Sequence, residues 1–174
     1  FCTLLKETLH NRKRERDIYE MPLYNLLLRL PETEHVLSVE PHKGRRWGLK
    51  FRCSGCGEVT ENFVFFSAED VVEEDGGTTN KVFSCKFCRK IVTIIVDERL
   101  YKPFVTAKST AAQPVATFDV RGAEPTEAML EDAWTVTCGE SKEDDGDDGS
   151  AAAAAVFEDV NLDDDWCDYD EDSG

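Results

Sequence analysis

Strict alternation of apolar and polar residues marks the clearest strand of this chain. Between Arg45 and Cys53 one face of the segment is apolar and is formed by Trp47, Leu49, Phe51 and Cys53. The opposite face carries arginine, lysine and glycine. A period of two residues predicts a half-buried β-strand. This strand carries Cys53 on its apolar face directly into a turn.

Other short apolar or β-branched segments predict further strands, separated by glycine and proline. They are Tyr24 to Leu30, His35 to Val39, Val59 to Phe66, Ile91 to Val96, Val115 to Val120 and Trp134 to Cys138. For Tyr24 to Leu30 a helix is the alternative. Ser67 to Asp70 resembles the start of a helix, which Gly76 and Gly77 would keep short. The pattern therefore predicts a mostly β fold with antiparallel sheets.

Two C-x2-C pairs interrupt this β pattern, and 28 residues separate Cys56 from Cys85. The pairs are Cys53 with Cys56 and Cys85 with Cys88. The first pair lies between two predicted strands. Lys81 to Ser84 leads into the second pair, and the predicted strand Ile91 to Val96 follows it, so each pair is expected in a hairpin turn. Four thiolates are a full tetrahedral set for a structural Zn²⁺ site, and two facing hairpin turns sharing one metal form a zinc-ribbon-like unit. Gly57 permits a positive φ after the first pair, whereas no glycine follows the second.

Other uses of the four cysteines fit the sequence less well. Two disulfides, or four ordinary buried cysteines, would not require the repeated spacing. A redox dithiol usually stands alone near a βαβ pattern, which is absent here. A catalytic zinc site keeps one open position, and four cysteines leave none. The sequence therefore predicts that Cys53, Cys56, Cys85 and Cys88 bind a structural Zn²⁺.

The charge of the chain is concentrated at its carboxyl end. Of the formal net charge of −16, residues 140–174 carry −14, from 15 acidic residues and one lysine. Such a tail favours solubility and repels nucleic acid. Residues 141–155 combine glycine-broken acidic residues with five alanines, a composition that cannot build a core.

These features divide the chain into five expected parts. The first is an amino-terminal extension, disordered or forming a short helix, and a zinc-binding β unit and a second β unit follow it. An acidic and alanine-rich insert then precedes an acidic end in which Trp166 and Tyr169 could act as anchors. Their expected bounds are 1–20, 21–105, 106–139, 140–155 and 156–174.

Nucleic-acid binding and catalysis remain as alternatives. Basic residues gather around the cysteine pairs and could contact phosphate: Arg45, Arg46, Lys50, Arg52, Lys86, Arg89 and Lys90. However, Trp47 and Phe51 lie on the predicted core face, so they would not stack on bases. No HExxH, GxSxG, P-loop or GxGxxG string is present, and the three histidines are scattered. Thiol oxidoreductase activity is the remaining enzymatic alternative, and we expect no enzyme.

Cysteine usage bears on location and partners. Seven cysteines, four of them in a metal pattern, favour a reducing compartment. We therefore expect a cytoplasmic protein that is also compatible with the nucleus. Cys2, Cys138 and Cys167 are expected to be spare thiols. No apolar segment approaches 20 residues, so no membrane association is expected. We expect an interaction or metal-handling module with a protein partner of unknown identity.

Several motifs, taken in order, resemble one family. A methionine precedes the first β segment, and a tryptophan precedes Leu-Lys-x-x-Cys-x-x-Cys-Gly-Glu. A Gly-Gly loop, Cys-Lys-x-Cys, Lys-Pro, Arg-Gly-x-Glu-Pro and Asn-Leu-x-x-x-Trp-x-Asp-Tyr-Asp-Glu follow. They lie at Met21, Trp47 to Glu58, Gly76 and Gly77, Cys85 to Cys88, Lys102 and Pro103, Arg121 to Pro125 and Asn161 to Glu171. Over residues 21–171 the chain resembles the eukaryotic CXXC-motif-containing zinc-binding proteins.

This resemblance implies a β-rich fold with one zinc held by the four cysteines and no established enzymatic activity. It also implies two similar small β units, of which only the first keeps the cysteine pairs. The family continues past the Asp-Tyr-Asp-Glu element into another apolar segment, whereas this chain stops at Gly174.

Overall fold

A computed structural model describes residues 2–7, 23–30, 33, 35–74, 77–107, 111–139 and 154–163, with backbone only for 2–7 and 74. The fold is mostly β, as predicted. The only helical segment among the described residues is the short 3-10 helix η1, Glu98–Leu100. No helix in this part of the chain is long and apolar enough to cross a membrane.

The strands are short, because glycine, proline and polar turns interrupt the apolar segments. In chain order they are β1 (Cys2–Glu7), β2 (Leu23–Leu28), β3 (Val36–Pro41), β4 (Trp47–Cys53), β5 (Val64–Phe66), β6 (Val72–Glu74), β7 (Gly77–Thr79), β8 (Lys81–Ser84), β9 (Ile91–Val96), β10 (Phe104–Val105), β11 (Gln113–Arg121), β12 (Ala123–Ala128), β13 (Trp134–Cys138) and β14 (Ala155–Val160).

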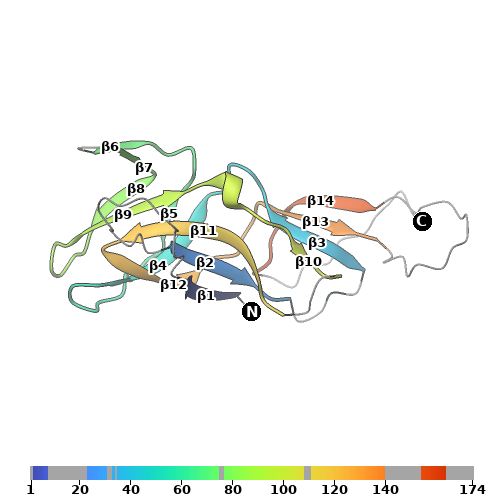
Figure 1. The fold of residues 1–174 in the computed structure, drawn as a ribbon, viewed down its shortest axis with the longest axis horizontal. Coiled ribbons are helices and arrows are strands. Elements are labelled where there is room, and N and C mark those ends of the chain that lie inside the picture. The colour runs from blue at the N-terminus through green and yellow to red at the C-terminus, as the bar shows by residue number, and fades with distance from the viewer. Residues whose placement is uncertain are drawn as a thin grey trace, which may run out of the picture.

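These strands form four antiparallel sheets (Figure 1). A five-stranded sheet has the order β1-β2-β11-β9-β8, and a four-stranded sheet has the order β10-β3-β13-β14. A three-stranded sheet has the order β12-β4-β5, and β6 pairs with β7. The turns that follow β4 and β8 lie at one end of the elongated molecule, and the four-stranded sheet lies at the other (Figure 1).

Strands from the two expected β units share these sheets. Strand β11 lies between β2 and β9, β12 pairs with β4, and β13 pairs with β3. Buried residues on both sides of residue 105 belong to one hydrophobic cluster. The residues assigned to 21–105 and 106–139 therefore pack as one structure.

Strand β4 fills the centre of the core as its alternation predicted. Trp47, Leu49 and Phe51 are buried, whereas Arg52 is exposed. The Trp47 ring makes edge-to-face contacts with the rings of Tyr101, Phe118 and Trp134. Its Nε1–H donates a hydrogen bond to the Tyr101 hydroxyl at 2.7 Å. Burying these large rings supplies much of the hydrophobic stabilisation of the fold.

Arg45, predicted as part of an exposed basic cluster, is instead buried at 2% exposure. Its guanidinium lies 4.7 Å from the ring centre of Trp47 and 4.5 Å from that of Trp134. It donates to the carbonyls of Met129, Glu131 and Asp132. A planar guanidinium group can stack on aromatic rings and donate several hydrogen bonds at once. Arg45 therefore holds the loop between β12 and β13 in place.

Two expectations for the chain between Val59 and Asp70 are corrected. The return from the first turn is not one continuous strand, because Val59 makes an isolated bridge with Arg52 before β5 begins. Ser67 to Asp70 is a turn and not a helix. The Ser67 N–H donates to the Asp70 carboxylate at 2.9 Å, and this local bond closes a single turn.

The ends of the chain also differ from expectation. Residues 2–7 form β1 along β2, where a disordered segment or a short helix was expected. Val156 and the next residues belong to β14, which pairs with β13. The expected anchors Trp166 and Tyr169 lie outside the described residues, as do 8–22 and most of the acidic insert.

Candidate metal centre

Strand β4 carries Cys53 from the core into the first cysteine turn. The Cys53 N–H donates to the carbonyl of Glu58 at 2.8 Å, and the Gly57 N–H donates to the Cys53 carbonyl at 2.9 Å. Gly57 has a φ of +79°, as predicted for the residue after the second cysteine. These bonds fold the chain tightly enough to turn Cys53 and Cys56 toward one point.

The second cysteine turn repeats this bonding between β8 and β9. The Cys85 N–H donates to the carbonyl of Lys90 at 2.9 Å, and the Arg89 N–H donates to the Cys85 carbonyl at 3.0 Å. Arg89 occupies the position of Gly57 and has a φ of +64°. A residue with a Cβ therefore adopts the left-handed conformation that glycine adopts more easily.

All four predicted ligand sulfurs come together. They lie within 4.8 Å of one another. Cys53 Sγ is 3.5 Å from Cys88 Sγ, and Cys56 Sγ is 3.6 Å from Cys85 Sγ. A tetrahedral zinc site with Zn–S distances of about 2.3 Å has sulfur separations of roughly 3.8 Å. The spacing and the chemistry of the donors therefore fit one Zn²⁺ ion.

The four cysteines differ in exposure and in electrostatic environment. Cys53 and Cys85 are buried, whereas Cys56 and Cys88 are exposed. Amides of Cys56 and Gly55 lower the pKa of the Cys53 thiol to about 6. Amides of Cys88 and Phe87 lower the pKa of Cys85. N–H groups directed at sulfur favour the thiolate, which is the form that binds metal.

The corner between β11 and β12 bonds to the first cysteine turn and packs against the start of β9. The carbonyl of Gly122, between β11 and β12, accepts from the Ser54 N–H at 3.1 Å and from the Ser54 hydroxyl at 2.8 Å. A Cβ built on Gly122 would lie 2.3 Å from the Ile91 carbonyl oxygen, next to the second turn. Only glycine fits there, and this close fit in the Arg-Gly-x-Glu-Pro motif was not predicted.

Three lysines lie near the cysteine turns, and two of them form ion pairs. Lys50 pairs with Glu127 at 2.8 Å, and Lys86 pairs with Glu61 at 3.5 Å. The Lys90 side chain lies beside Gly55, 3.2 Å from the position of a Cβ built there. Cations around the turns offset part of the formal charge of −2 that four thiolates on Zn²⁺ would carry.

Among the side chains that the structure describes, the other cysteine and the two histidines do not belong to this four-cysteine group. Cys138 is at the end of β13, and burial raises the pKa of its thiol. His35 and His42 are exposed. The side chains of Cys2, His10 and Cys167 lie outside the part that the structure describes.

Comparisons with known proteins agree on the fold and on the metal. A protein of Homo sapiens named CXXC motif containing zinc binding protein is 28% identical over 142 residues, covering 79% of this chain and 81% of the human one. UPF0587 protein F46B6.12 of Caenorhabditis elegans is 27% identical over 128 residues, covering 72% of this chain and 70% of the relative.

Two solved structures share the fold. The crystal structure of C1orf123 aligns with a TM-score of 0.72 and 26% identity, covering 87% of this chain and 89% of that chain. A hypothetical protein from Plasmodium falciparum aligns with a TM-score of 0.63 and 22% identity, covering 82% and 85%.

The family itself is shown by a match over most of the chain. The model of the eukaryotic CXXC motif containing zinc binding proteins matches residues 27–174. All four clustered cysteines lie within this range and are arranged to hold a metal ion. The chain therefore belongs to the eukaryotic family of CXXC motif containing zinc binding proteins.

Proposed function

We propose that Cys53, Cys56, Cys85 and Cys88 bind one Zn²⁺ in a closed structural site, and that the zinc-clamped turns present a binding surface to a protein partner. The observation that carries this proposal is the convergence of four sulfurs within 4.8 Å from two turns far apart in the chain. Four protein ligands fill the tetrahedral shell, as in structural zinc sites.

The metal would connect two sheets. Strand β4, before the first cysteine turn, belongs to the three-stranded sheet, and β8 and β9 belong to the five-stranded sheet. Structural Zn²⁺ binding contributes about 10–16 kcal/mol, which is comparable with a whole-domain stability of about 5–15 kcal/mol. Metal binding would therefore decide whether this end of the molecule is folded.

A non-catalytic role follows from the closed ligand set. The four cysteines leave no open coordination position for substrate or water, so the metal would act by holding the two turns in place. Val59 and Phe87 are exposed and line the same cavity beside the cysteines. Exposed apolar groups gathered at one place are typical of protein-binding surfaces.

Nucleic-acid binding is the weaker alternative. Arg45 is buried between two tryptophans and cannot contact phosphate. Trp47 and Phe51 are buried in the core and cannot stack on bases. Salt-dependent binding of an oligonucleotide to a chain that lacks the acidic tail would favour this alternative.

Metal exchange is a second candidate function because two of the four ligands face solvent. Cys56 and Cys88 are exposed, one from each turn. An incoming thiol could reach these sulfurs first, and soft thiolates accept zinc or copper(I). Rapid transfer of zinc to a chelator, within minutes and without unfolding, would support exchange over a structural role.

The proposed site is tested by metal analysis of the purified protein. We expect one zinc per chain in the wild type and in Cys138→Ser, the matched control for loss of a thiol. We expect less than about half an equivalent of zinc in Cys53→Ser. A wild-type protein with less than about half an equivalent after gentle purification would contradict the proposal.

The proposed compartment follows from thiol chemistry. Reduced thiolates are needed to bind zinc, and the cytoplasm and the nucleus keep thiols reduced. We therefore place the protein in one or both of these compartments. A tagged protein found only outside the cell in a fractionation experiment would contradict this.

A further inference from the structure

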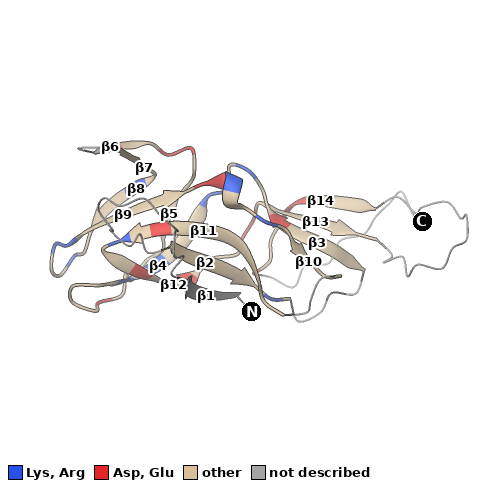
Figure 2. Ribbon diagram, viewed as in Figure 1, with Lys and Arg blue, Asp and Glu red and all other residues tan. Residues whose placement is uncertain are grey.

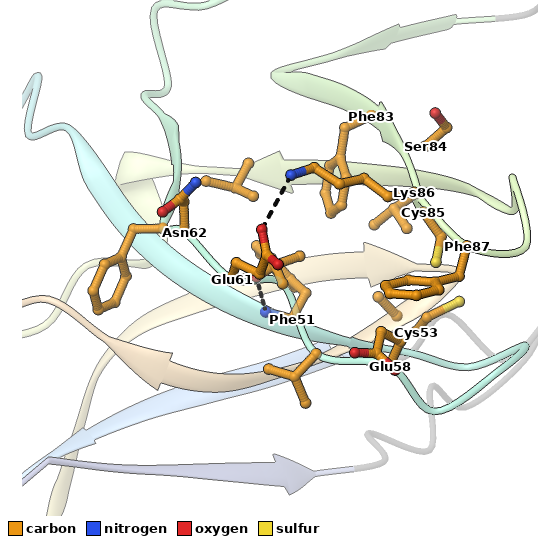
Figure 3. A pocket seen from close by; sticks show the side chains of 16 residues that line it. Phe51, Cys53, Glu58, Glu61, Asn62, Phe83, Ser84, Cys85, Lys86 and Phe87 are labelled. Carbon is orange, nitrogen blue, oxygen red and sulfur yellow. Dashed lines mark hydrogen bonds and ion pairs between the residues drawn. The ribbon is translucent and has the colours of Figure 1, made fainter.

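A cavity of about 260 Å³ lies beside the cysteine turns (Figure 3). One wall is the segment between the first cysteine turn and β5, and the other is β8 with the start of the second turn. Strand β8 is the last strand of the five-stranded sheet, and β5 is the last strand of the three-stranded sheet. The cavity therefore lies where the edges of the two sheets meet.

The lining of the cavity is mainly apolar and rich in aromatic rings. Phe51, Phe63, Phe83 and Phe87 line it together with valine and alanine side chains. Phe87 is 69% exposed at the mouth. Pockets for drug-sized ligands occupy about 300–1,000 Å³. This smaller apolar space suits one bulky side chain better than a cofactor.

Strand β8 offers hydrogen-bonding groups next to this space. Within the described part of the chain it pairs only with β9. Because the Cys85 N–H donates to Lys90, alternation along an antiparallel ladder directs the backbone groups of Val82 and Ser84 to the opposite edge. A free strand edge of this kind can accept another extended chain.

The charges of this hairpin favour an acidic partner. Residues 81–90 contain four basic residues and no acidic residue. The basic residues of the second cysteine turn are exposed, and the ribbon that joins β8 to β9 is blue in this turn (Figure 2). A four-thiolate zinc site would offset two of these charges and leave the hairpin with a net positive charge. The facing wall of the cavity carries Glu58 and Glu61, so the positive charge is confined to the β8 side, where the added strand would lie.

The mouth can open without a large cost. The ion pair between Lys86 and Glu61 crosses it at 3.5 Å, and both side chains are 77% exposed (Figure 3). Exposed ion pairs contribute little to stability, because water screens the two charges. A peptide carboxylate could therefore replace Glu61 as the partner of Lys86 at little cost.

From these observations we propose that an extended acidic segment of a partner protein adds to the free edge of β8 and inserts one bulky apolar side chain into this cavity. The proposal identifies the class of partner for the protein-binding role proposed above, and it rests on that role. Backbone hydrogen bonds to β8 would supply affinity, and the cavity would select the side chain.

The test uses a phage library of random heptapeptides selected on the immobilised, zinc-loaded full chain. We expect enriched peptides with one Phe, Trp or Leu flanked by Asp or Glu. In ¹H–¹⁵N spectra, a synthetic peptide of this consensus should shift the amide signals of Val82, Ser84 and Phe87. Changing its bulky residue to Ser should weaken binding by about tenfold or more.

Two variants test the edge and the cavity separately. Val82→Pro removes an N–H that faces the free edge, which an edge strand tolerates, and Val82→Ala is its control. Phe87→Asp places a charge at the mouth. We expect Val82→Pro and Phe87→Asp each to weaken peptide binding by about tenfold, and Val82→Ala to bind like the wild type.

The proposal would be overturned if no peptide were enriched, if the consensus lacked a bulky apolar residue, or if the peptide bound equally well to Val82→Pro. Peptide binding that appears only after removal of residues 164–174 would assign the cavity to the chain's own tail and overturn the partner assignment. Zinc content is measured on the same samples. A zinc-loaded protein that selects no peptide would refute this inference and leave the proposed metal site standing.

Discussion

Exchanging the residues that follow the two cysteine pairs tests how each turn is held. Gly57 and Arg89 occupy equivalent positions, with φ values of +79° and +64°. A Cβ on Gly57 would meet nothing within 4 Å. Gly57→Ala therefore changes backbone preference alone, whereas Arg89→Gly should relieve a strain that the second turn already carries.

The expected size follows from two opposing terms. A residue with a Cβ in the left-handed region costs roughly 1–2 kcal/mol, and the greater chain entropy of glycine offsets about 0.5–1 kcal/mol of that. We therefore expect Gly57→Ala to lower the free energy of unfolding by about 1 kcal/mol. Arg89→Gly should be more stable than Arg89→Ala by about the same amount, because both variants lack the guanidinium.

The assay is urea unfolding followed by tryptophan fluorescence at a fixed free zinc concentration, because zinc binding itself shifts stability. In thermal unfolding the same changes correspond to shifts of about 2–4 °C. Arg89→Lys is the control that keeps both the charge and the strain, and it should match the wild type. If Arg89→Gly were no more stable than Arg89→Ala, or Gly57→Ala unfolded like the wild type, the left-handed backbone would not limit these turns.

Three further predictions concern the surroundings of the turns and the core. Gly122→Ala should destabilise the protein by more than about 2 kcal/mol, because the added Cβ would lie 2.3 Å from the Ile91 carbonyl oxygen. Urea unfolding measures this change, and a variant as stable as the wild type would contradict the geometry of this corner. Tyr101→Phe should cost about 1–3 kcal/mol by leaving the Trp47 N–H without its acceptor. Burial raises the pKa of the Tyr101 phenol in the folded protein. As pH rises, the phenol of the unfolded chain, with a pKa of about 10, therefore ionises before that of the folded chain. Wild-type stability should therefore fall as pH rises above about 10, and Tyr101→Phe should remove this contribution, as unfolding measured from pH 8 to 11 would show. Arg45→Lys should cost about 2–4 kcal/mol, because lysine cannot stack between two rings and donate to three carbonyls; calorimetry with Arg46→Lys as the exposed control checks this.

The sequence by itself determined the features that depend on neighbouring residues. Ile91 to Val96 and Trp134 to Cys138 form strands with the predicted bounds, and the alternation in β4 placed Trp47 on the buried face. The cysteine spacing also brought each pair into a hairpin turn. Period-two patterns and C-x2-C spacing are local, so chain geometry alone translates them into structure.

Only the tertiary structure decided which strands are neighbours. An alternating pattern predicts that one face of a strand is buried, but it does not indicate which other strand pairs with it. No local signal indicated that β11 lies between β2 and β9, or that Gly122 bonds to the first cysteine turn and packs against the start of β9. The sequence predicted Arg45 as a surface cation. A charge can be buried favourably only when suitable groups surround it, and the rings and carbonyls around Arg45 come from distant parts of the chain. The cavity beside β8 likewise exists only where the edges of two sheets meet.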